Sequence, residues 1–228
     1  MTYAITPPAV TSLPIAGSEQ RFPVRRIFCI GRNYADHARE MGATVDKETP
    51  LFFCKPADAV VTDGADVRYP QATHDLHHEV EMVVALAAGG TDISVEQAAS
   101  LIFGYGVGLD LTRRDLQAIA KAKSHPWDVA KGFDDSAPVS ALVPAAQARV
   151  GDDTLLSLSI NGQARQQAHL GDMVHSVPEI IATLSKLFEL KAGDLIFTGT
   201  PAGVSALQRG DRFVAELHGV ATLEGRVV

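Results

Sequence analysis

The sequence is poor in cysteine, has no long apolar run and has no excess of basic residues. Its two cysteines, Cys29 and Cys54, are too few for a disulfide framework, so we expect a reducing, cytoplasmic environment. The longest apolar run, Met82 to Ala88, is much shorter than a membrane-spanning helix, and we expect no membrane association. No basic residue precedes Arg21, and we therefore expect no secretory signal peptide.

The charge balance disfavours one class of partner. The chain has 27 Asp and Glu against 20 Lys and Arg, which gives a net charge of −7. General binding of nucleic acid needs basic surfaces that neutralise phosphates, so we expect no nucleic-acid partner. The 228 residues are 46% hydrophobic, which is enough for a folded core and far from the composition of a disordered chain.

The chain divides into an arm and one domain. Residues 1–22 contain three prolines and no sustained periodicity, and they predict an irregular arm that is ordered only where it docks. Residues 23–228 contain no repeat or linker and are expected to form a single domain. Within this domain the expected strands are 26–30, 51–54, 59–62, 79–86, 103–110, 154–160, 195–198, 212–217 and 220–228, and the expected helices are 34–41, 94–101, 112–123 and 176–190. Because strands dominate and helices do not alternate regularly with them, we predict a mixed, β-rich α+β fold.

Local signals mark the ends of several of these elements. Ser94 with Gln97, and Ser176 with Glu179, have the spacing of a capping box at the start of a helix. The dipeptide Asn161-Gly162 favours a type I′ turn and predicts a hairpin after the strand at 154–160.

Glu79 and Glu81 lie in the most β-like segment, EVEMVVAL. Side chains in a strand alternate between its faces, so both carboxylates share one face, while Val80, Met82 and Val84 make the other face apolar. If both faces are covered, two like charges are buried together, which is costly unless a cation or a shifted pKa relieves them. The alternative is an edge strand whose glutamates point into water.

Asp110 joins these two glutamates as a candidate ligand, because it ends the glycine-rich run FGYGVGLD where a strand gives way to a helix. Three carboxylates without thiolate ligands suit a hard cation, so the set predicts a site for Mg²⁺ or Mn²⁺. His74, His77 and His78 lie just upstream and offer zinc as the alternative. On a loop before a strand, we expect these histidines to be solvated or to support the site indirectly.

His37 and Glu40 are three residues apart in a short helical stretch and therefore share a face. A carboxylate beside an imidazole fixes its tautomer and raises its basicity, so the pair predicts a base that activates water. An ordinary ion pair on the surface is the alternative for this spacing.

Arg114 and Gln117 have the same spacing in the helix that is expected to begin at Thr112. Near the positive N-terminal end of that helix they could hold a substrate carboxylate or carbonyl. Lys131, in the stretch AKGF, is a further candidate cation. The segment 198–201 (TGTP) follows the apolar run LIF and could line a pocket with its hydroxyls and amides. Solvent exposure, or a plain turn at 198–201, is the alternative for each.

Seven motifs follow one another along the chain with a recognisable spacing. They are IGRNYADHAREMG (30–42), FFCKPADAVV (52–61), HHEVEMVVAL (77–86), GYGVGLDLTRRDLQ (104–117), PWDVAKGF (126–133), INGQARQ (160–166) and GDLIFTGTPAGV (193–204). In this order the chain resembles the fumarylacetoacetate hydrolase family over about residues 24–228. The stretch FFCKPADAVV is most similar to the bacterial members that cleave fumarylpyruvate in gentisate breakdown.

The resemblance implies a mixed β-roll that is usually a homodimer, with Mg²⁺ or Mn²⁺ in each subunit. It implies that Glu79, Glu81 and Asp110 are the metal ligands. It also implies that His37 and Glu40 activate water from a short segment that becomes ordered as a lid when ligand binds. The positions that match substrate-contacting residues are Arg114, Gln117, Lys131 and Thr200, together with Lys55 of the KP motif.

For such a site the resemblance implies hydrolysis of a 2,4-dioxo acid, such as 3-fumarylpyruvate, to fumarate and pyruvate. Glu40 would orient His37, which would deprotonate the attacking water, while Lys131 and Thr200 would stabilise oxyanion character. The alternatives are decarboxylation of oxaloacetate, hydrolysis of acetylpyruvate, isomerisation of an unsaturated oxo acid, and a non-catalytic module that binds metal for stability.

Overall fold

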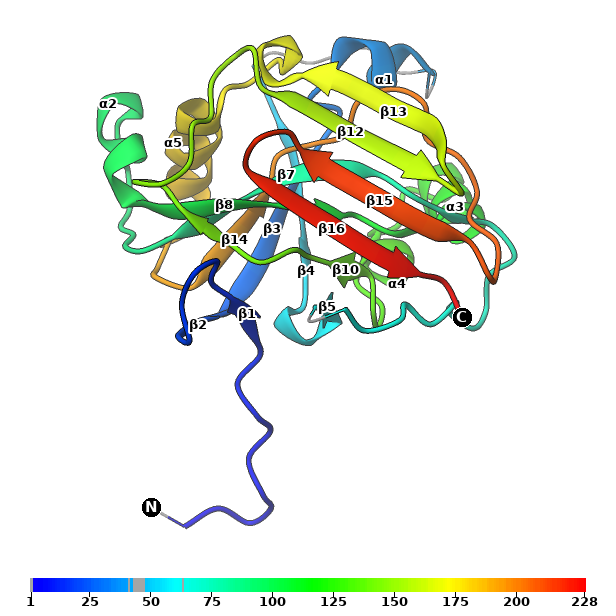
Figure 1. Cartoon of the computed structure of the whole chain (residues 1–228), viewed down its shortest axis with the longest axis horizontal. Helices are drawn as coiled ribbons and strands as arrows, with labels where there is room; N and C mark the ends of the chain where they lie inside the picture. The colour runs from blue at the N-terminus through cyan, green and yellow to red at the C-terminus, as the bar shows by residue number, and fades with distance from the viewer. Residues whose placement is uncertain (1, 41, 43–47, 63) are drawn as a thin grey trace.

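The structure is a computed structural model that describes every residue except 1, 41, 43–47 and 63. Its body consists of a mixed six-stranded sheet and an antiparallel four-stranded sheet that lies across one face of the first (Figure 1). Helices are few and lie at the edges of the sheets. The predicted mixed α+β fold is therefore confirmed.

The six-stranded sheet has the order β11-β8-β7-β14-β3-β4, in which β14 and β3 are parallel and the other neighbours are antiparallel. Its strands are β3 (Arg26–Gly31), β4 (Leu51–Lys55), β7 (Val80–Leu86), β8 (Ile102–Leu109), β11 (Val143–Pro144) and β14 (Asp194–Phe197). The four-stranded sheet, in the order β13-β12-β15-β16, contains β12 (Leu155–Ile160), β13 (Gln163–His169), β15 (Arg212–Leu217) and β16 (Ala221–Arg226).

Shorter elements complete the fold. The two-stranded sheets pair β1 (Ser12–Pro14) with β2 (Arg21–Pro23), β5 (Val60–Val61) with β10 (Ala137–Pro138), and β6 (Leu76–His77) with β9 (Thr112–Arg113). The α-helices are α1 (Ala35–Glu40), α2 (Val95–Ala98), α3 (Arg114–Ala122), α4 (Asp128–Lys131) and α5 (Val177–Leu187), and short 3₁₀ turns occur at Ala57–Ala59, Ala99–Leu101 and Leu170–Asp172.

The larger hydrophobic core fills the space between the two sheets. Met82 and Val107 enter it from β7 and β8, while Leu158 and Phe213 enter it from β12 and β15. Residues of α5, among them Ile181, close one end of this core. The alternation along β7 thus directs its even-numbered side chains into this core, as the sequence pattern predicts.

The opposite face of the six-stranded sheet packs into a second, smaller core that includes Val83 and Phe197. Leu13 and Phe22, on the hairpin of β1 and β2, are buried in the same core. The part of the expected N-terminal arm from residue 11 onward is therefore docked, whereas residues 2–10 extend away from the body (Figure 1).

Several local predictions are confirmed. Ser94 caps α2 and exchanges hydrogen bonds with Gln97, and the amide and hydroxyl of Ser176 both donate to the Glu179 carboxylate at the start of α5. The turn between β12 and β13 has positive φ angles at the Asn161-Gly162 pair (51° and 77°), as a type I′ turn requires.

Other boundaries differ from the prediction because tertiary pairing overrides local pattern. Thr112 does not begin a helix; it pairs with β6 as part of β9, its hydroxyl bonds to the Asp110 carbonyl (3.1 Å), and α3 starts two residues later. The longest helix ends at Leu187, since the backbone of Leu190 exchanges hydrogen bonds with Gly90 (2.9 Å each). The expected strand at 59–62 shortens to β5, and the last residue of the expected helix 34–41 lies outside the described residues.

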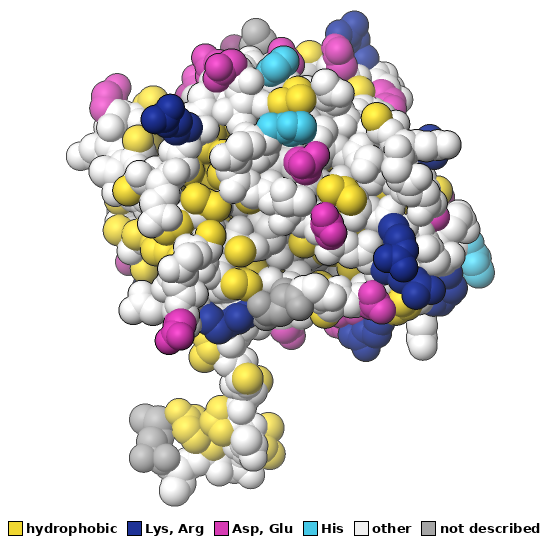
Figure 2. Space-filling view, in the orientation of Figure 1, with side chains coloured by type: hydrophobic (Ala, Val, Ile, Leu, Met, Phe, Trp, Pro, Cys, Tyr) yellow, Lys and Arg dark blue, Asp and Glu magenta, His cyan; other side chains and the backbone are white. Residues whose placement is uncertain are grey.

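Within the described ranges, none of the helices combines the length and the apolarity needed to cross a membrane. On the face shown in Figure 2, Lys and Arg occur in small groups with Asp and Glu between them. This face therefore does not offer the continuous basic surface that general nucleic-acid binding requires.

Candidate metal centre and active site

Three buried carboxylates meet where β7 begins and β8 ends. Val80 pairs with Leu109, and the amide of Asp110 donates a hydrogen bond to the Glu79 carbonyl (2.8 Å). Glu81 shares the face of Glu79 because side chains in a strand alternate. Ligand oxygens of the three carboxylates lie within 4.8 Å of one another, and none of the three residues is more than 5% exposed. The alternative of an edge strand with its glutamates in water is therefore wrong.

Cationic side chains neutralise two of the three carboxylates. Glu79 binds Arg114 (2.6 Å) and Lys131 (2.7 Å), while Asp110 binds Lys131 (2.7 Å) and Lys55 (2.8 Å). Burial opposes ionisation of Glu79, but the charges of Lys131 and Arg114 outweigh it and hold the pKa of this carboxyl well below its ordinary value.

Glu81 is the exception in the cluster. Its carboxylate accepts a hydrogen bond from the Gly199 amide (2.7 Å), but no cationic side chain within the described residues forms an ion pair with it. Burial, followed by the charges of Asp110 and Glu79, raises the pKa of Glu81 well above its ordinary value. An ionised Glu81 therefore requires further positive charge. A divalent cation between the three carboxylates would supply this charge, and a set of carboxylate oxygens suits Mg²⁺ or Mn²⁺.

The histidines upstream of β7 do not join this cluster. His74 is exposed, and His77 Nε2 lies 2.8 Å from a neighbouring aspartate. His78 is fully buried, with Nδ1 2.8 Å from Gln166 Oε1. Among the residues that the structure describes, the carboxylates are the one group of three or more His, Cys, Asp or Glu side chains close enough to share an ion. The geometry thus gives the zinc alternative no support.

His37 and Glu40, both on α1, form the predicted pair beside the same cavity. His37 Nδ1 lies 3.4 Å from Glu40 Oε2, and the Gly203 amide donates to both oxygens of this carboxylate (3.1 Å each). The imidazole is buried and lines the cavity, which does not fit an ordinary surface ion pair. Burial lowers the pKa of His37, although Glu79 and Glu40 oppose this effect. The ring is therefore neutral near pH 7 and able to accept a proton.

One face of α3 presents polar side chains to the cavity. Arg114, Gln117 and Lys121 are three and four residues apart and project from the same side of the helix. Arg114 donates to Gln117 Oε1 (2.7 Å) as well as to Glu79, so its guanidinium is fixed beside the carboxylates. Lys131 reaches the cluster from the end of α4. The predicted grouping of Arg114, Gln117 and Lys131 is therefore present.

Two threonines after β14 have different contacts. Thr198 donates to the Met82 carbonyl (3.0 Å) and ties this segment to β7. Thr200 lines the cavity and accepts a hydrogen bond from Gln166 Nε2 (2.8 Å), while Gln166 Oε1 accepts from the Val80 amide (3.1 Å). Because Gln166 Nε2 is a donor, the hydroxyl hydrogen of Thr200 remains available to a ligand.

Lys55 lies behind Asp110, not among the residues that line the cavity. Its ammonium forms an ion pair with Asp110 without the alignment of a hydrogen bond, and it donates to the Leu111 carbonyl (3.1 Å) and to the Lys131 carbonyl. The geometry favours neutralisation of Asp110 over the predicted contact with substrate.

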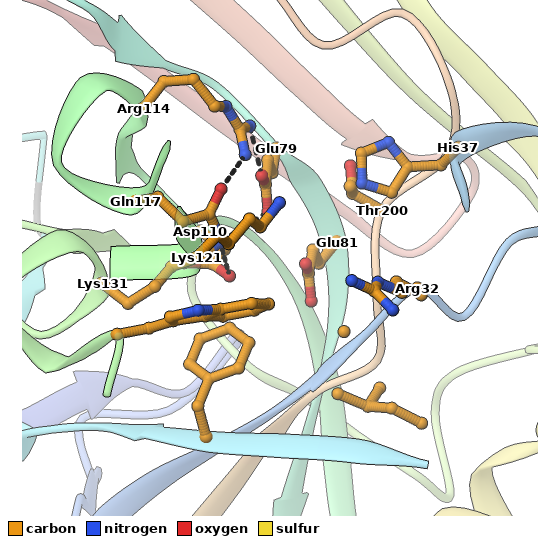
Figure 3. Close-up of a pocket in the computed structure, with 14 residues that line it drawn as sticks. Arg32, His37, Glu79, Glu81, Asp110, Arg114, Gln117, Lys121, Lys131 and Thr200 are labelled. Atoms are coloured by element: carbon orange, nitrogen blue, oxygen red, sulfur yellow. Dashed lines mark hydrogen bonds and ion pairs between the residues drawn. The ribbon is translucent and has the colours of Figure 1, made fainter. Parts of the chain in front are cut away.

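Sequence reasoning missed several residues of the cavity wall, namely Arg32, Phe53, Lys121 and Trp127. Arg32 and Lys121 are labelled in Figure 3. Lys121 could have been found from its spacing of seven residues from Arg114, which places both on one helix face. Arg32 has a left-handed backbone (φ 62°), a conformation that the sequence does not signal for arginine. The free space among the lining side chains is about 30 Å³, room for an ion and a water.

Comparisons with known proteins agree with this geometry. The family described as fumarylacetoacetate (FAA) hydrolase C-terminal matches residues 26–228. A crystal structure of fumarylpyruvate hydrolase from Pseudomonas aeruginosa, in complex with Mn²⁺ and pyruvate, is 47% identical with a TM-score of 0.96, and the match covers 100% of this chain and 99% of that chain.

Two curated relatives carry a different description. Oxaloacetate tautomerase YcgM of Escherichia coli (strain K12) is 44% identical over 200 residues, which cover 87% of this chain and 90% of the relative. The mitochondrial oxaloacetate tautomerase FAHD1 of Bos taurus is 40% identical over 203 residues, with coverages of 89% and 91%. Relatives at this level of identity thus include both a fumarylpyruvate hydrolase and oxaloacetate tautomerases.

Proposed function

This chain belongs to the fumarylacetoacetate hydrolase family, and we propose that it is a metal-dependent hydrolase that cleaves a carbon–carbon bond of an acylpyruvate. The proposed substrate is 3-fumarylpyruvate, an intermediate of gentisate-type aromatic catabolism, and the proposed products are fumarate and pyruvate. We assign the catalytic domain to residues 23–228, with Mg²⁺ or Mn²⁺ as cofactor, a homodimer as assembly and the cytoplasm as compartment. The Mn²⁺ and pyruvate in the similar Pseudomonas enzyme are the metal and the product that this proposal expects.

One observation carries the proposal. The neutral imidazole of His37 lines the same cavity as the carboxylates of Glu79, Glu81 and Asp110. Hydrolysis needs a base that deprotonates water and a Lewis acid that polarises the oxo acid. The cavity contains a candidate base and the carboxylates that could hold a cation as the Lewis acid.

The residues divide the proposed reaction between them. The bound cation would act as a Lewis acid toward the carboxylate and 2-oxo oxygens of the substrate. Arg114 and Lys131, already fixed beside the cluster, are positioned to bind the substrate carboxylate. His37 takes a proton from water, and the water oxygen bonds to the 4-oxo carbon. Glu40 stabilises the imidazolium that results.

Cleavage then follows from this addition. The C3–C4 bond breaks, and its electron pair stays on C3 as the enolate of pyruvate. The proton held by His37 passes to C3 to give pyruvate, while C4 becomes the carboxylic acid of the second product, which releases its remaining proton to solvent as the carboxylate. The Thr200 hydroxyl, held by Gln166, donates to the oxygen that carries negative charge during these steps.

The aromatic part of the cavity wall borders a neighbouring hollow. Its volume is about 470 Å³, and it shares Phe53, Trp127 and Lys131 with the wall of the cavity. An acyl chain that leaves the 4-oxo carbon in this direction meets aromatic surface, which favours an unsaturated acyl group over a bare methyl group.

Conversion of oxaloacetate is the second candidate, because two curated relatives are described as oxaloacetate tautomerases. Oxaloacetate offers the same 2-oxo acid end to the cation, and its tautomerisation or decarboxylation needs no attacking water. His37 could serve such a reaction as the group that moves a proton at C3.

A spectrophotometric comparison separates the two candidates. The kcat/KM values for fumarylpyruvate, maleylpyruvate, acetylpyruvate and oxaloacetate are measured with Mg²⁺, with the metal-free protein as control. We expect fumarylpyruvate to give the highest value and the metal-free protein to be inactive. A clear preference for oxaloacetate would overturn the proposed hydrolase.

A further inference from the structure

Two cationic side chains of the cavity have no anionic partner within the described part of the chain. Arg32 and Lys121 both line the cavity, yet neither forms a hydrogen bond or ion pair with a described carboxylate. Lys121 Nζ lies 5.3 Å from the centroid of the Trp127 ring. Arg114 and Lys131, by contrast, each have a carboxylate oxygen within 2.7 Å. The carboxylates of the protein thus engage Arg114 and Lys131. Arg32 and Lys121 are exposed residues that remain available to a ligand.

The backbone holds Arg32 at some cost. Its φ of 62° lies in the left-handed region, which a residue with a side chain occupies against its preference. Such strain persists where the surrounding structure enforces it, and it is common at binding sites. Figure 3 shows the guanidinium of Arg32 reaching over the cavity beside Glu81, while Lys121 extends into the same space from the side of α3.

The charge of the cavity calls for more than one anionic group on the ligand. Its wall contains four cationic side chains and three carboxylates, and His37 is neutral, so the protein contributes about one positive charge. A divalent cation would add two. The carboxylate of an oxo acid provides one negative charge, and the enolate formed on cleavage is balanced by the imidazolium of His37, which leaves two positive charges unmatched.

The unmatched positive charge lies on Arg32 and Lys121, because these two side chains have no carboxylate partner among the described residues. Burial is the main cause that lowers the pKa of Lys121, and the charges of Arg114 and Arg32 add to it while Glu79 opposes it, so Arg32 and Lys121 are near enough to repel each other. An anion bound between the two free cations would relieve this repulsion without disturbing the ion pairs of Arg114 and Lys131.

We propose that Arg32 and Lys121 form a subsite for a second carboxylate, at the acyl end of the substrate, and that the enzyme therefore selects dicarboxylic over monocarboxylic acylpyruvates. This inference rests on the proposed acylpyruvate hydrolase function and assigns its substrate class. Trp127, which lies beside Lys121, and Phe53, whose ring centroid is 6.1 Å from that of Trp127, would contact the apolar part of the acyl group between the two charged ends.

A matched pair of substrates tests the subsite. Fumarylpyruvate carries the distal carboxylate, and crotonylpyruvate has a methyl group in its place with the same double bond and chain length. We expect the wild-type kcat/KM to favour fumarylpyruvate by at least about tenfold, the size of one charge-assisted contact. In Lys121→Met and in Arg32→Gln this preference should fall by about tenfold, mainly through KM.

Lys123→Met is the control, because Lys123 is exposed at the end of the same helix and is not part of the cavity wall. We expect this variant to keep the wild-type preference. Equal kcat/KM for the two substrates in the wild type, an unchanged preference in both cavity variants, or the same loss in Lys123→Met would overturn the subsite.

A binding measurement separates failure of the subsite from failure of the proposed hydrolase. In a His37→Ala background with Mg²⁺ bound, calorimetry gives the Kd of each acylpyruvate without turnover. If the wild-type enzyme cleaves neither compound, the proposed hydrolase is wrong, and the Kd ratio still decides the inference. Tighter binding of fumarylpyruvate by about tenfold or more supports the subsite, and equal affinities contradict it.

Discussion

One face of β7 changes character along its length. At its beginning Glu79 and Glu81 are buried in a cluster of charges, whereas Val83 and Ala85 on the same face are buried in the smaller hydrophobic core. Alternation is identical in both halves, so secondary structure does not distinguish them. The apolar half of the strand therefore stabilises the fold. The charged half carries Glu81, which destabilises the fold when no cation is bound.

Neighbouring elements create this difference. Over the second half, the side chains of Val83 and Phe197 both pack against Gly108. A Cβ atom at Gly108 would lie 3.0 Å from each of these two side chains. Over the first half, the elements that face the strand supply cations and amides, including Lys131 and the Gly199 amide. Neutralisation of Glu81, the carboxylate of the first half that has no cationic partner in the described chain, should therefore reduce activity without reducing stability, and truncation of Val83 in the second half should do the reverse.

The largest effect is expected for Glu81→Gln. Loss of a metal ligand should lower kcat/KM for fumarylpyruvate on the order of 10³-fold, because the Lewis acid contributes several kcal/mol. The metal-free variant should unfold at a higher temperature than metal-free wild type, since a buried carboxyl with a raised pKa is replaced by a neutral group. Glu224→Gln, an exposed change of the same kind, should alter neither property. If Glu81→Gln keeps wild-type activity, or if its metal-free form unfolds at a lower temperature than the metal-free wild type, the proposed difference between the two halves of β7 is wrong.

His37→Ala should lower kcat by about 10²- to 10⁴-fold, the usual contribution of a positioned base. Its affinity for Mn²⁺, measured by calorimetry, and its melting temperature should remain close to those of the wild type, because His37 is not a member of the carboxylate cluster. His74→Ala serves as control, since this histidine is exposed. Turnover near the wild-type rate would rule out His37 as the base.

Val83→Ala addresses the apolar half of β7. Removal of two methyl groups from a packed core should cost about 2 kcal/mol of unfolding free energy. In a chain of this size that corresponds to a melting temperature about 4–8 °C lower, measurable by calorimetry. The kcat/KM at 25 °C should stay within about twofold of the wild type, as expected for a substitution outside the site. A large loss of activity at unchanged stability would show that the two halves are not separate.

The smallest effect concerns pH. Burial places the pKa of His37 below its ordinary value of 6.5, and hydrolysis requires the neutral ring, so kcat/KM should fall as the pH drops below about 6.5. The Glu40 hydrogen bond and charge raise this pKa, so in Glu40→Gln the acid limb should move to lower pH. The pH profile of kcat/KM at saturating metal gives the position of the acid limb in the wild type and in Glu40→Gln. A shift of the limb to higher pH would exclude this pairing.

The parts of the site that follow from local geometry were predictable. Alternation in a strand placed Glu79 and Glu81 on one face, and helix periodicity placed His37 beside Glu40. The contact of Asp110 with Glu79 depends on the register of β7 against β8, which joins distant parts of the chain. The position of Asp110 at the end of a predicted strand and the family resemblance both indicated it as a ligand, but neither gave the register that produces this contact.

Other features depend on tertiary pairing that sequence patterns do not contain. Threonine is a common helix-capping residue, but Thr112 pairs with β6, so the helix begins two residues later, at Arg114. Lys121 and Arg32 look like ordinary surface cations, because the missing partner of a cation is not visible in a sequence. Lys55 follows a family motif, yet only the packing shows that it neutralises Asp110 from behind.

Titration of the metal-free chain with Mn²⁺ tests the central claim most directly. Glu79, Glu81 and Asp110 are buried within 4.8 Å of one another, and Glu81 lacks a cationic partner among the described residues. We predict that calorimetry detects one Mn²⁺ per wild-type chain and none bound by Glu81→Gln over the same concentration range. Absence of binding by the wild type, or equal binding by both proteins, would contradict the assignment of these carboxylates as a metal centre.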